Sequence, residues 1–107
     1  MRQMTPTELA ERLADSGREP PVLLDVREPW EFETCHIEGS KLMPMASVPA
    51  RAGELDPGAE VVVICHHGSR SAQVGMFLER QGFGNVVNLS GGVASWAAQV
   101  DPSMPQY

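Results

Sequence analysis

The stretch Val61-Val62-Val63-Ile64 constrains the fold of this chain more than any other feature. An unbroken run of β-branched residues, without polar alternation, is typical of a strand covered on both faces, as in a parallel sheet flanked by helices. Asp56-Pro57-Gly58 marks a turn before the run, and a helical pattern begins after Ser71. A polar loop, residues 65–70, is therefore expected between the carboxyl end of a strand and the amino end of a helix.

The rest of the chain alternates between predicted strands and predicted helices. The patterns predict helices near 5–17, 29–32, 47–55 and 71–81 and a last one from 93, and strands over 22–26, 41–43, 61–64 and 86–89. Strands that alternate with helices through short connections indicate an α/β fold with a mostly parallel sheet. Ligands of such sheets gather at the carboxyl ends of the strands. Asp25, Cys65 and the Ser90-Gly91-Gly92 turn all occupy such ends.

Length and composition narrow the class of protein. The 107 residues suit one domain over 1–107, and 42% apolar and 21% charged residues are ordinary for a globular protein. A formal net charge of −6 with one lysine, Lys41, argues against nucleic acid as a ligand. No stretch resembles a signal peptide or a membrane span, so we expect no membrane partner and a cytoplasmic location.

Cys65 is the candidate nucleophile. Backbone N–H groups and the helix dipole favour an anion there, but a helix terminus contributes only about 0.3–1 kcal/mol. Converging loop amides, which Gly68 permits, and the Arg70 guanidinium must add to it. The alternative is that Cys65 is only the last buried residue of a strand. The candidate loop residues that would bind an anion are His66, His67, Gly68, Ser69, Arg70 and Ser71.

Four strings in order resemble the single-domain rhodanese family of sulfurtransferases. They are Leu24-Asp25-Val26-Arg27-Glu28 with Trp30-Glu31-Phe32, then His36-Ile37-Glu38-Gly39-Ser40, then the Cys65 loop, then Asn88-Leu89-Ser90-Gly91-Gly92 with Trp96. The resemblance spans nearly the whole chain. It implies a single rhodanese-like domain with a central five-stranded sheet flanked by helices on both faces, a catalytic cysteine at Cys65, and no metal or organic cofactor.

The resemblance also implies a reaction. In a double displacement, the Cys65 thiolate takes sulfur from a small anionic donor such as thiosulfate and holds it as a persulfide. The sulfur then passes to cyanide or to a thiol, which includes a protein thiol. Four residues separate Cys65 from Arg70, whereas the related phosphatase signatures place five residues there. The smaller ring of amides suits sulfur better than a phosphoryl group, which disfavours phosphatase or arsenate reductase chemistry. A non-catalytic binding module and a sulfur carrier to a partner protein remain as alternatives.

Two further residues, Asp25 and Arg27, lie at a strand end near the expected site. The family pattern favours structural roles for them, with Asp25 bracing the loop and Arg27 in an ion pair for which a glutamate is the candidate partner. His66 and His67 occupy positions that are basic in thiosulfate-using relatives, which tilts the choice of donor toward thiosulfate. We expect these histidines to line the loop rather than to act as a general base.

Cys35 is the second cysteine, and a role as resolving thiol for Cys65 is a minor hypothesis. A reducing compartment makes free thiols the default. A metal site built from the cysteines and histidines is disfavoured, because adjacent residues on an extended backbone point in opposite directions and no zinc-type spacing is present.

Overall fold

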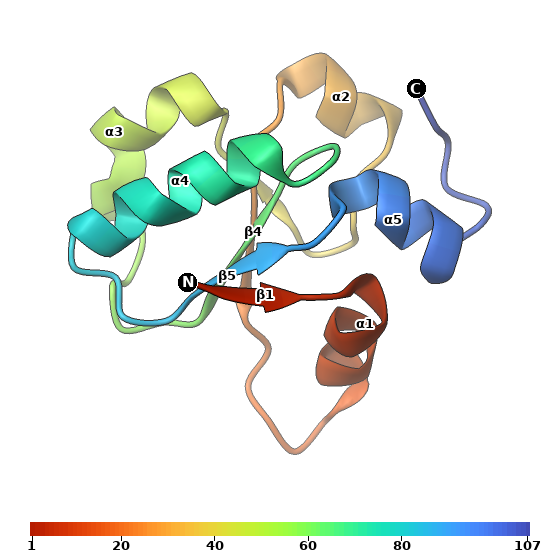
Figure 1. The fold of residues 1–107 in the computed structure, drawn as a ribbon, viewed down its shortest axis with the longest axis horizontal. Helices are drawn as coiled ribbons and strands as arrows, with labels where there is room; N and C mark the ends of the chain where they lie inside the picture. The colour runs from red at the N-terminus through yellow and green to blue at the C-terminus, as the bar shows by residue number, and fades with distance from the viewer.

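The computed structural model describes residues 1–107, which form one parallel sheet with helices on both faces (Figure 1). The five strands are β1 (Arg2–Met4), β2 (Val22–Asp25), β3 (Lys41–Leu42), β4 (Val61–Ile64) and β5 (Val86–Leu89). They lie in the order β1-β5-β4-β2-β3, and every neighbouring pair is parallel. The predicted five-stranded α/β fold is confirmed.

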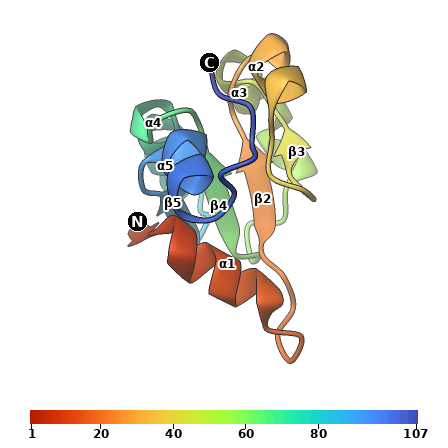
Figure 2. The ribbon, with the colours of Figure 1, turned by 90° about the vertical axis from the view of Figure 1, so that its right-hand side faces the viewer.

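Helices cover both faces of the sheet (Figures 1 and 2). They are α1 (Pro6–Ala14), α2 (Pro29–Thr34), α3 (Val48–Arg51), α4 (Ser69–Arg80) and α5 (Gly92–Gln99). Buried residues of α1 and α5 pack on one face of the sheet, and those of α3 and α4 pack on the other. None of the helices combines the length and apolar composition needed to cross a bilayer.

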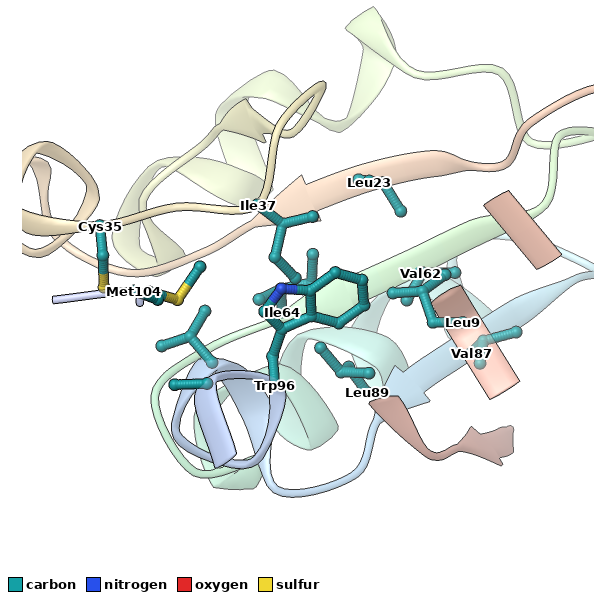
Figure 3. Packing of buried hydrophobic residues seen from close by; sticks show 12 residues of the cluster. Leu9, Leu23, Cys35, Ile37, Val62, Ile64, Val87, Leu89, Trp96 and Met104 are labelled. Carbon is teal, nitrogen blue, oxygen red and sulfur yellow. The ribbon is translucent and has the colours of Figure 1, made fainter. Parts of the chain in front are cut away.

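The sheet separates two clusters of buried apolar side chains, and β4 contributes to both. Val62 and Ile64 face the cluster on the α1 and α5 side, where Trp96 lies close to Ile64 (Figure 3). Val61 and Val63 face the other cluster. Because water reaches neither face, all four residues of this strand are apolar, and their exposure is 0%.

Most predicted elements are present with slightly different bounds, but one strand was not predicted and the helix after the Cys65 loop begins early. β1 was not predicted, because Arg2-Gln3-Met4 is short and largely polar; it forms an edge strand whose register places Arg2 opposite Val87. The helix predicted from Ser71 begins two residues earlier, at Ser69. Gly68 precedes it with φ of 105°, a left-handed conformation that suits glycine, so the turn from loop to helix is completed sooner.

Candidate active site

Cys65 follows β4 directly at the carboxyl edge of the sheet, as the alternation of strands predicts. The first turn of α5 forms hydrogen bonds with the backbone of the loop. Cys65 O accepts a hydrogen bond from Val93 N at 2.9 Å, and His66 O accepts one from Ala94 N at 3.1 Å. A Cβ on Gly92, which has φ of 58°, would collide with both carbonyl groups. The close approach of α5 therefore requires glycine at 92.

Cys65 is buried, with its residue 1% exposed, and the groups within hydrogen-bonding distance of its thiol are uncharged. Gly68 N donates a hydrogen bond to Cys65 Sγ at 3.0 Å, and Ser71 Oγ lies 3.3 Å from the same sulfur. Ser71 Oγ also contacts Asn88 Oδ1 and, at 3.1 Å, Gly68 O. We call Cys65, Gly68, Ser71 and Asn88 the neutral cluster.

The hydroxyl of Ser71 can act toward the sulfur in two ways. It carries one hydrogen and has three neighbouring acceptors, on Cys65, Gly68 and Asn88. Ser71 accepts from Cys65 when the thiol is protonated, and can rotate to donate to the sulfur when the thiol is ionised. The thiolate then has two donors, one from a backbone amide and one from a hydroxyl. Converging donors of this kind suit a negative charge on sulfur, and the Arg70 guanidinium lies close enough to interact electrostatically with Cys65.

The side chain of Arg70 forms an ion pair. Its guanidinium donates two hydrogen bonds to the carboxylate of Glu31, Nη1 to Oε1 at 2.7 Å and Nη2 to Oε2 at 2.9 Å. Glu31 is buried, with its side chain 5% exposed, whereas that of Arg70 is 34% exposed. The hydrogen bonds from Arg70 lower the pKa of Glu31 to about 2, and Glu31 raises the pKa of Arg70 above its usual range. Both side chains are therefore charged at pH 7.

A second ion pair lies deeper. Arg27 and Asp25 are both 0% exposed, and Arg27 donates to both carboxylate oxygens of Asp25, with Nη2 at 2.7 Å from Oδ2. Arg27 Nη2 also donates to Cys35 O at 2.7 Å. The expected ion pair of Arg27 is present, but its partner is Asp25 and not a glutamate, because the carboxylate two residues before Arg27 lies against its guanidinium and Glu31 is bound to Arg70.

Tyr107 joins the two ion pairs. Its hydroxyl donates to Glu31 Oε2 at 2.7 Å and accepts from Arg27 Nη1 at 2.9 Å. Burial and the hydrogen bond to Glu31 raise the pKa of Tyr107 to about 12, so the phenol keeps its proton at pH 7. We call Asp25, Arg27, Glu31, Arg70 and Tyr107 the charged network.

The two loop histidines lie together. The ring of His66 is 4.0 Å from that of His67 and is stacked at 4.2 Å on the ring of Tyr107. Burial, together with the neighbouring His67, lowers the pKa of His66 below its usual value, which favours the neutral imidazole at pH 7. His66 is half-buried and His67 is exposed. Neither ring has a hydrogen bond to the thiol.

The structure places the remaining predicted residues as follows. Ser69 is exposed in the first turn of α4. Asp25 lies at the end of β2, on the strand beside β4, but its carboxylate contacts Arg27 and makes no hydrogen bond to residues 65–71. The predicted bracing of the loop by Asp25 is therefore indirect, through Arg27, Tyr107 and Glu31.

Three residues of the site were not singled out by sequence reasoning. Glu31 and Asn88 lie inside the family strings, but their partners Arg70 and Ser71 are 39 and 17 residues away. No local pattern shows such a pairing. Tyr107 stands outside every motif, so only the path of the chain after α5 brings it to the loop.

Cys35 and Cys65 are both free and belong to different buried clusters, on opposite faces of the sheet. Cys35 Sγ lies 3.9 Å from Arg27 Nη1. The arrangement does not place Cys35 to resolve a modified Cys65. No group of three or more His, Cys, Asp or Glu side chains is arranged to hold a metal ion.

Fold and site together define the class: a parallel α/β domain that presents a cysteine at the end of a central strand, in a loop closed by an arginine. Within that class, residues 5–99 match the model of the Rhodanese-like domain. The chain belongs to the rhodanese-like domain family, as its motifs indicate.

Individual relatives support this family assignment. The chain is 39% identical over 89 residues to a sulfurtransferase of Allochromatium vinosum, covering 83% of this chain and 81% of the relative. It is 37% identical over 91 residues to the thiosulfate sulfurtransferase GlpE of Pseudomonas fluorescens, covering 85% and 81%. A crystal structure of a rhodanese-like domain protein from Staphylococcus aureus superimposes with a TM-score of 0.83 at 32% identity, covering 90% of this chain and 91% of that one.

Other relatives are longer than this chain. It spans 30% of the Rhodanese-like/PpiC domain-containing protein 12 of Arabidopsis thaliana and 43% of a putative sulfur carrier protein of Bacillus subtilis. The same domain thus occurs both nearly alone and as part of larger chains.

Proposed function

We propose that this domain transfers sulfane sulfur through a persulfide on Cys65. The observation that carries the proposal is the hydrogen bond from Gly68 N to Cys65 Sγ at 3.0 Å, inside a loop that also offers the Ser71 hydroxyl. These donors stabilise negative charge on sulfur in both the thiolate and the persulfide. Relatives named as sulfurtransferases support sulfur transfer as the general class of activity.

The reaction has two displacements. The Cys65 thiolate attacks the outer sulfur of thiosulfate, a new S–S bond forms, and the bond between the two thiosulfate sulfurs breaks, with its electron pair leaving on sulfite. An acceptor, cyanide or a thiolate, then attacks the outer sulfur of the persulfide. The S–S bond to Cys65 breaks and the thiolate is restored. No net oxidant or reductant is needed when cyanide is the acceptor.

Thiosulfate is the proposed donor, because the loop presents Arg70 together with two histidines and the backbone amides of residues 66–71. A relative named as a thiosulfate sulfurtransferase supports the choice. The acceptor is proposed to be cyanide, a small thiol or a protein thiol, and the relative named as a putative sulfur carrier favours a protein thiol as the second candidate. A cytoplasmic setting, which keeps both cysteines reduced, fits this chemistry.

The test is a mass measurement on the intact protein. Incubation with thiosulfate should add one sulfur, roughly 32 Da, and cyanide should remove it. Cys65→Ser should stay unchanged, whereas Cys35→Ser, the matched control for a buried thiol, should gain sulfur like the wild type. An unchanged mass for the wild type, or a gain that persists in Cys65→Ser, would contradict the proposal.

Turnover separates an enzyme from a binding module. Wild-type protein should form thiocyanate from thiosulfate and cyanide at a rate that Cys65→Ser abolishes. Equal, low rates for the two proteins would favour the non-catalytic module.

The role of Arg70 has its own test. Arg70→Ala should raise the half-saturating thiosulfate concentration by about tenfold, the usual effect of losing one charge-assisted hydrogen bond. Persulfide formation from a neutral organic polysulfide should fall much less, since a neutral donor has no charge for the guanidinium to attract. An equal loss for both donors would contradict a role of Arg70 in anion binding.

A further inference from the structure

The segment after α5 returns to the active-site loop. Both views of the ribbon place the C-terminal end beside α2 (Figures 1 and 2). There Tyr107 stacks on His66, with ring centroids 4.2 Å apart and planes 21° apart, and meets Trp30 edge-on at 5.2 Å. Pro105, Gln106 and Tyr107 line a small pocket with His66 and Cys35. The last residues of the chain thus form one wall of the loop.

The hydroxyl of Tyr107 acts on the carboxylate that holds Arg70. Glu31 Oε2 accepts from Arg70 Nη2 and from Tyr107, while Oε1 accepts from Arg70 Nη1 and, at 3.0 Å, from Glu28 N. Four donors therefore share the charge of one buried carboxylate. Arg27 Nη1 in turn donates to the phenol oxygen, which polarises its O–H toward Glu31.

These hydrogen bonds to Glu31 affect how strongly the Arg70 guanidinium can bind an incoming anion. Glu31 competes with any anionic donor for the guanidinium, because both are negative and both bind the same N–H groups. Each further hydrogen bond to Glu31 reduces the negative charge that Arg70 must balance. Without the Tyr107 hydroxyl, Glu31 would bind Arg70 more strongly and would repel an anion at the loop more strongly.

We propose that Tyr107 is a positioning residue for the anionic sulfur donor: its hydroxyl takes up part of the negative charge of Glu31 and so leaves the Arg70 guanidinium more available to that donor. This inference rests on the proposed sulfur transfer. Tyr107 acts through Glu31 and Arg70, and it makes no hydrogen bond to Cys65. It should therefore affect how strongly the donor binds and leave the step at sulfur unchanged.

Tyr107→Phe tests the hydroxyl alone, since the phenyl ring retains the stacking on His66. The rate of persulfide formation in a single turnover is measured against thiosulfate concentration by intact mass. The half-saturating concentration should rise roughly fivefold, the effect of one net hydrogen bond. The limiting rate should stay within about twofold of the wild type, since the donors to Cys65 Sγ are untouched.

A double substitution shows whether Tyr107 acts through Arg70. A lysine cannot make the paired hydrogen bonds with Glu31. In the Arg70→Lys background, Tyr107→Phe should therefore change the half-saturating concentration by less than about twofold. The matched control is Thr34→Val, which removes a hydroxyl that bonds Trp30 O on the same helix as Glu31 and should leave both parameters unchanged.

Three outcomes would overturn the inference. One is an unchanged half-saturating concentration in Tyr107→Phe, and another is an equal fall in the limiting rate. The third is the same effect in the wild-type and Arg70→Lys backgrounds. In each case the wild type still forms the persulfide, so the proposed function stands. A wild type that forms no persulfide overturns the proposed function and the inference with it.

Discussion

The neutral cluster and the charged network meet at the same loop but are built differently. In the neutral cluster, the hydrogen-bonding contacts of Cys65 Sγ are a backbone N–H and a hydroxyl. In the charged network, each ionised side chain is bound to one of opposite sign, Asp25 to Arg27 and Glu31 to Arg70. The negative charge on sulfur that the proposed reaction requires would be met at Cys65 by hydrogen-bond donors, whereas the permanent charges are balanced in pairs.

The physical reason for the difference is the cost of desolvation. A buried ion that loses its partner is strongly destabilising, so permanent charges near the core must be paired. Oriented dipoles carry no net charge and cost little to bury when their hydrogen bonds are satisfied. Removing a buried carboxylate of the charged network should therefore cost mainly stability, whereas substitutions in the neutral cluster should act mainly on rate. Four predictions test this division, starting with the largest effect.

Asp25→Asn should destabilise the fold by about 3–5 kcal/mol, because it leaves the fully buried Arg27 without a counter-charge. Urea denaturation at pH 7 measures the change. Glu54→Gln, which breaks the exposed pairs with Arg51 and Lys41, is the control and should leave the midpoint nearly unchanged. A loss no larger than in this control would show that the charged network does not carry stability.

Gly92→Ala should cost about 3 kcal/mol, since the new Cβ collides with the Cys65 and His66 carbonyl groups and the residue has a positive φ. Because the carbonyl groups that would be displaced belong to the active-site loop, persulfide formation should slow as well. Gly53→Ala is the control, because a Cβ there meets no atom within 4 Å. Equal stability of the two variants would mean that α5 does not fix the loop.

Glu31→Gln should change how stability depends on pH. The pKa of Glu31 is about 2 in the folded chain and 4.5 ordinarily, so its ionised form stabilises the fold above about pH 4.5 and loses this effect as the pH falls toward 2. The wild type should exceed Glu31→Gln by on the order of 2 kcal/mol at pH 7. Urea midpoints of both proteins should converge as the pH falls to about 2, and a constant gap would contradict the ion pair.

Ser71→Ala should act on rate more than on stability. The sulfur loses one of its two donors, so persulfide formation should slow about tenfold, which corresponds to about 1.4 kcal/mol in the barrier. The free energy of unfolding should fall by about 1 kcal/mol for the bond to Asn88. Ser69→Ala, an exposed serine of the same turn, is the control. An unchanged rate in Ser71→Ala would remove the hydroxyl from the proposed chemistry.

Much of the architecture was predictable because its causes are local. The apolar runs 22–26, 61–64 and 86–89 each became a strand of a sheet covered on both faces. β1 escaped prediction because a three-residue edge strand needs neither apolar alternation nor a long run. Its pairing depends on β5, which is more than eighty residues away.

The residues of the candidate site also divide into those that local sequence predicts and those that only tertiary contacts show. Cys65, Gly68 and Arg70 were identified because strand, glycine turn and helix follow one another directly along the chain. The partner of Arg27 was predicted wrongly, since a sequence does not show which of several carboxylates lies nearest to a guanidinium. Nothing near Tyr107 in the sequence indicates an active site.

The sequence by itself determined the parallel α/β fold, the place of Cys65 at the end of a central strand, and the spacing of four residues between Cys65 and Arg70. These follow from periodicity, turn residues and loop length, which are short-range properties. Only the tertiary structure decided that Arg70 is held by Glu31, that Ser71 and Asn88 complete the surroundings of the thiol, and that Tyr107 lies against the loop. Such contacts join distant segments, because packing and charge pairing select partners by proximity in space.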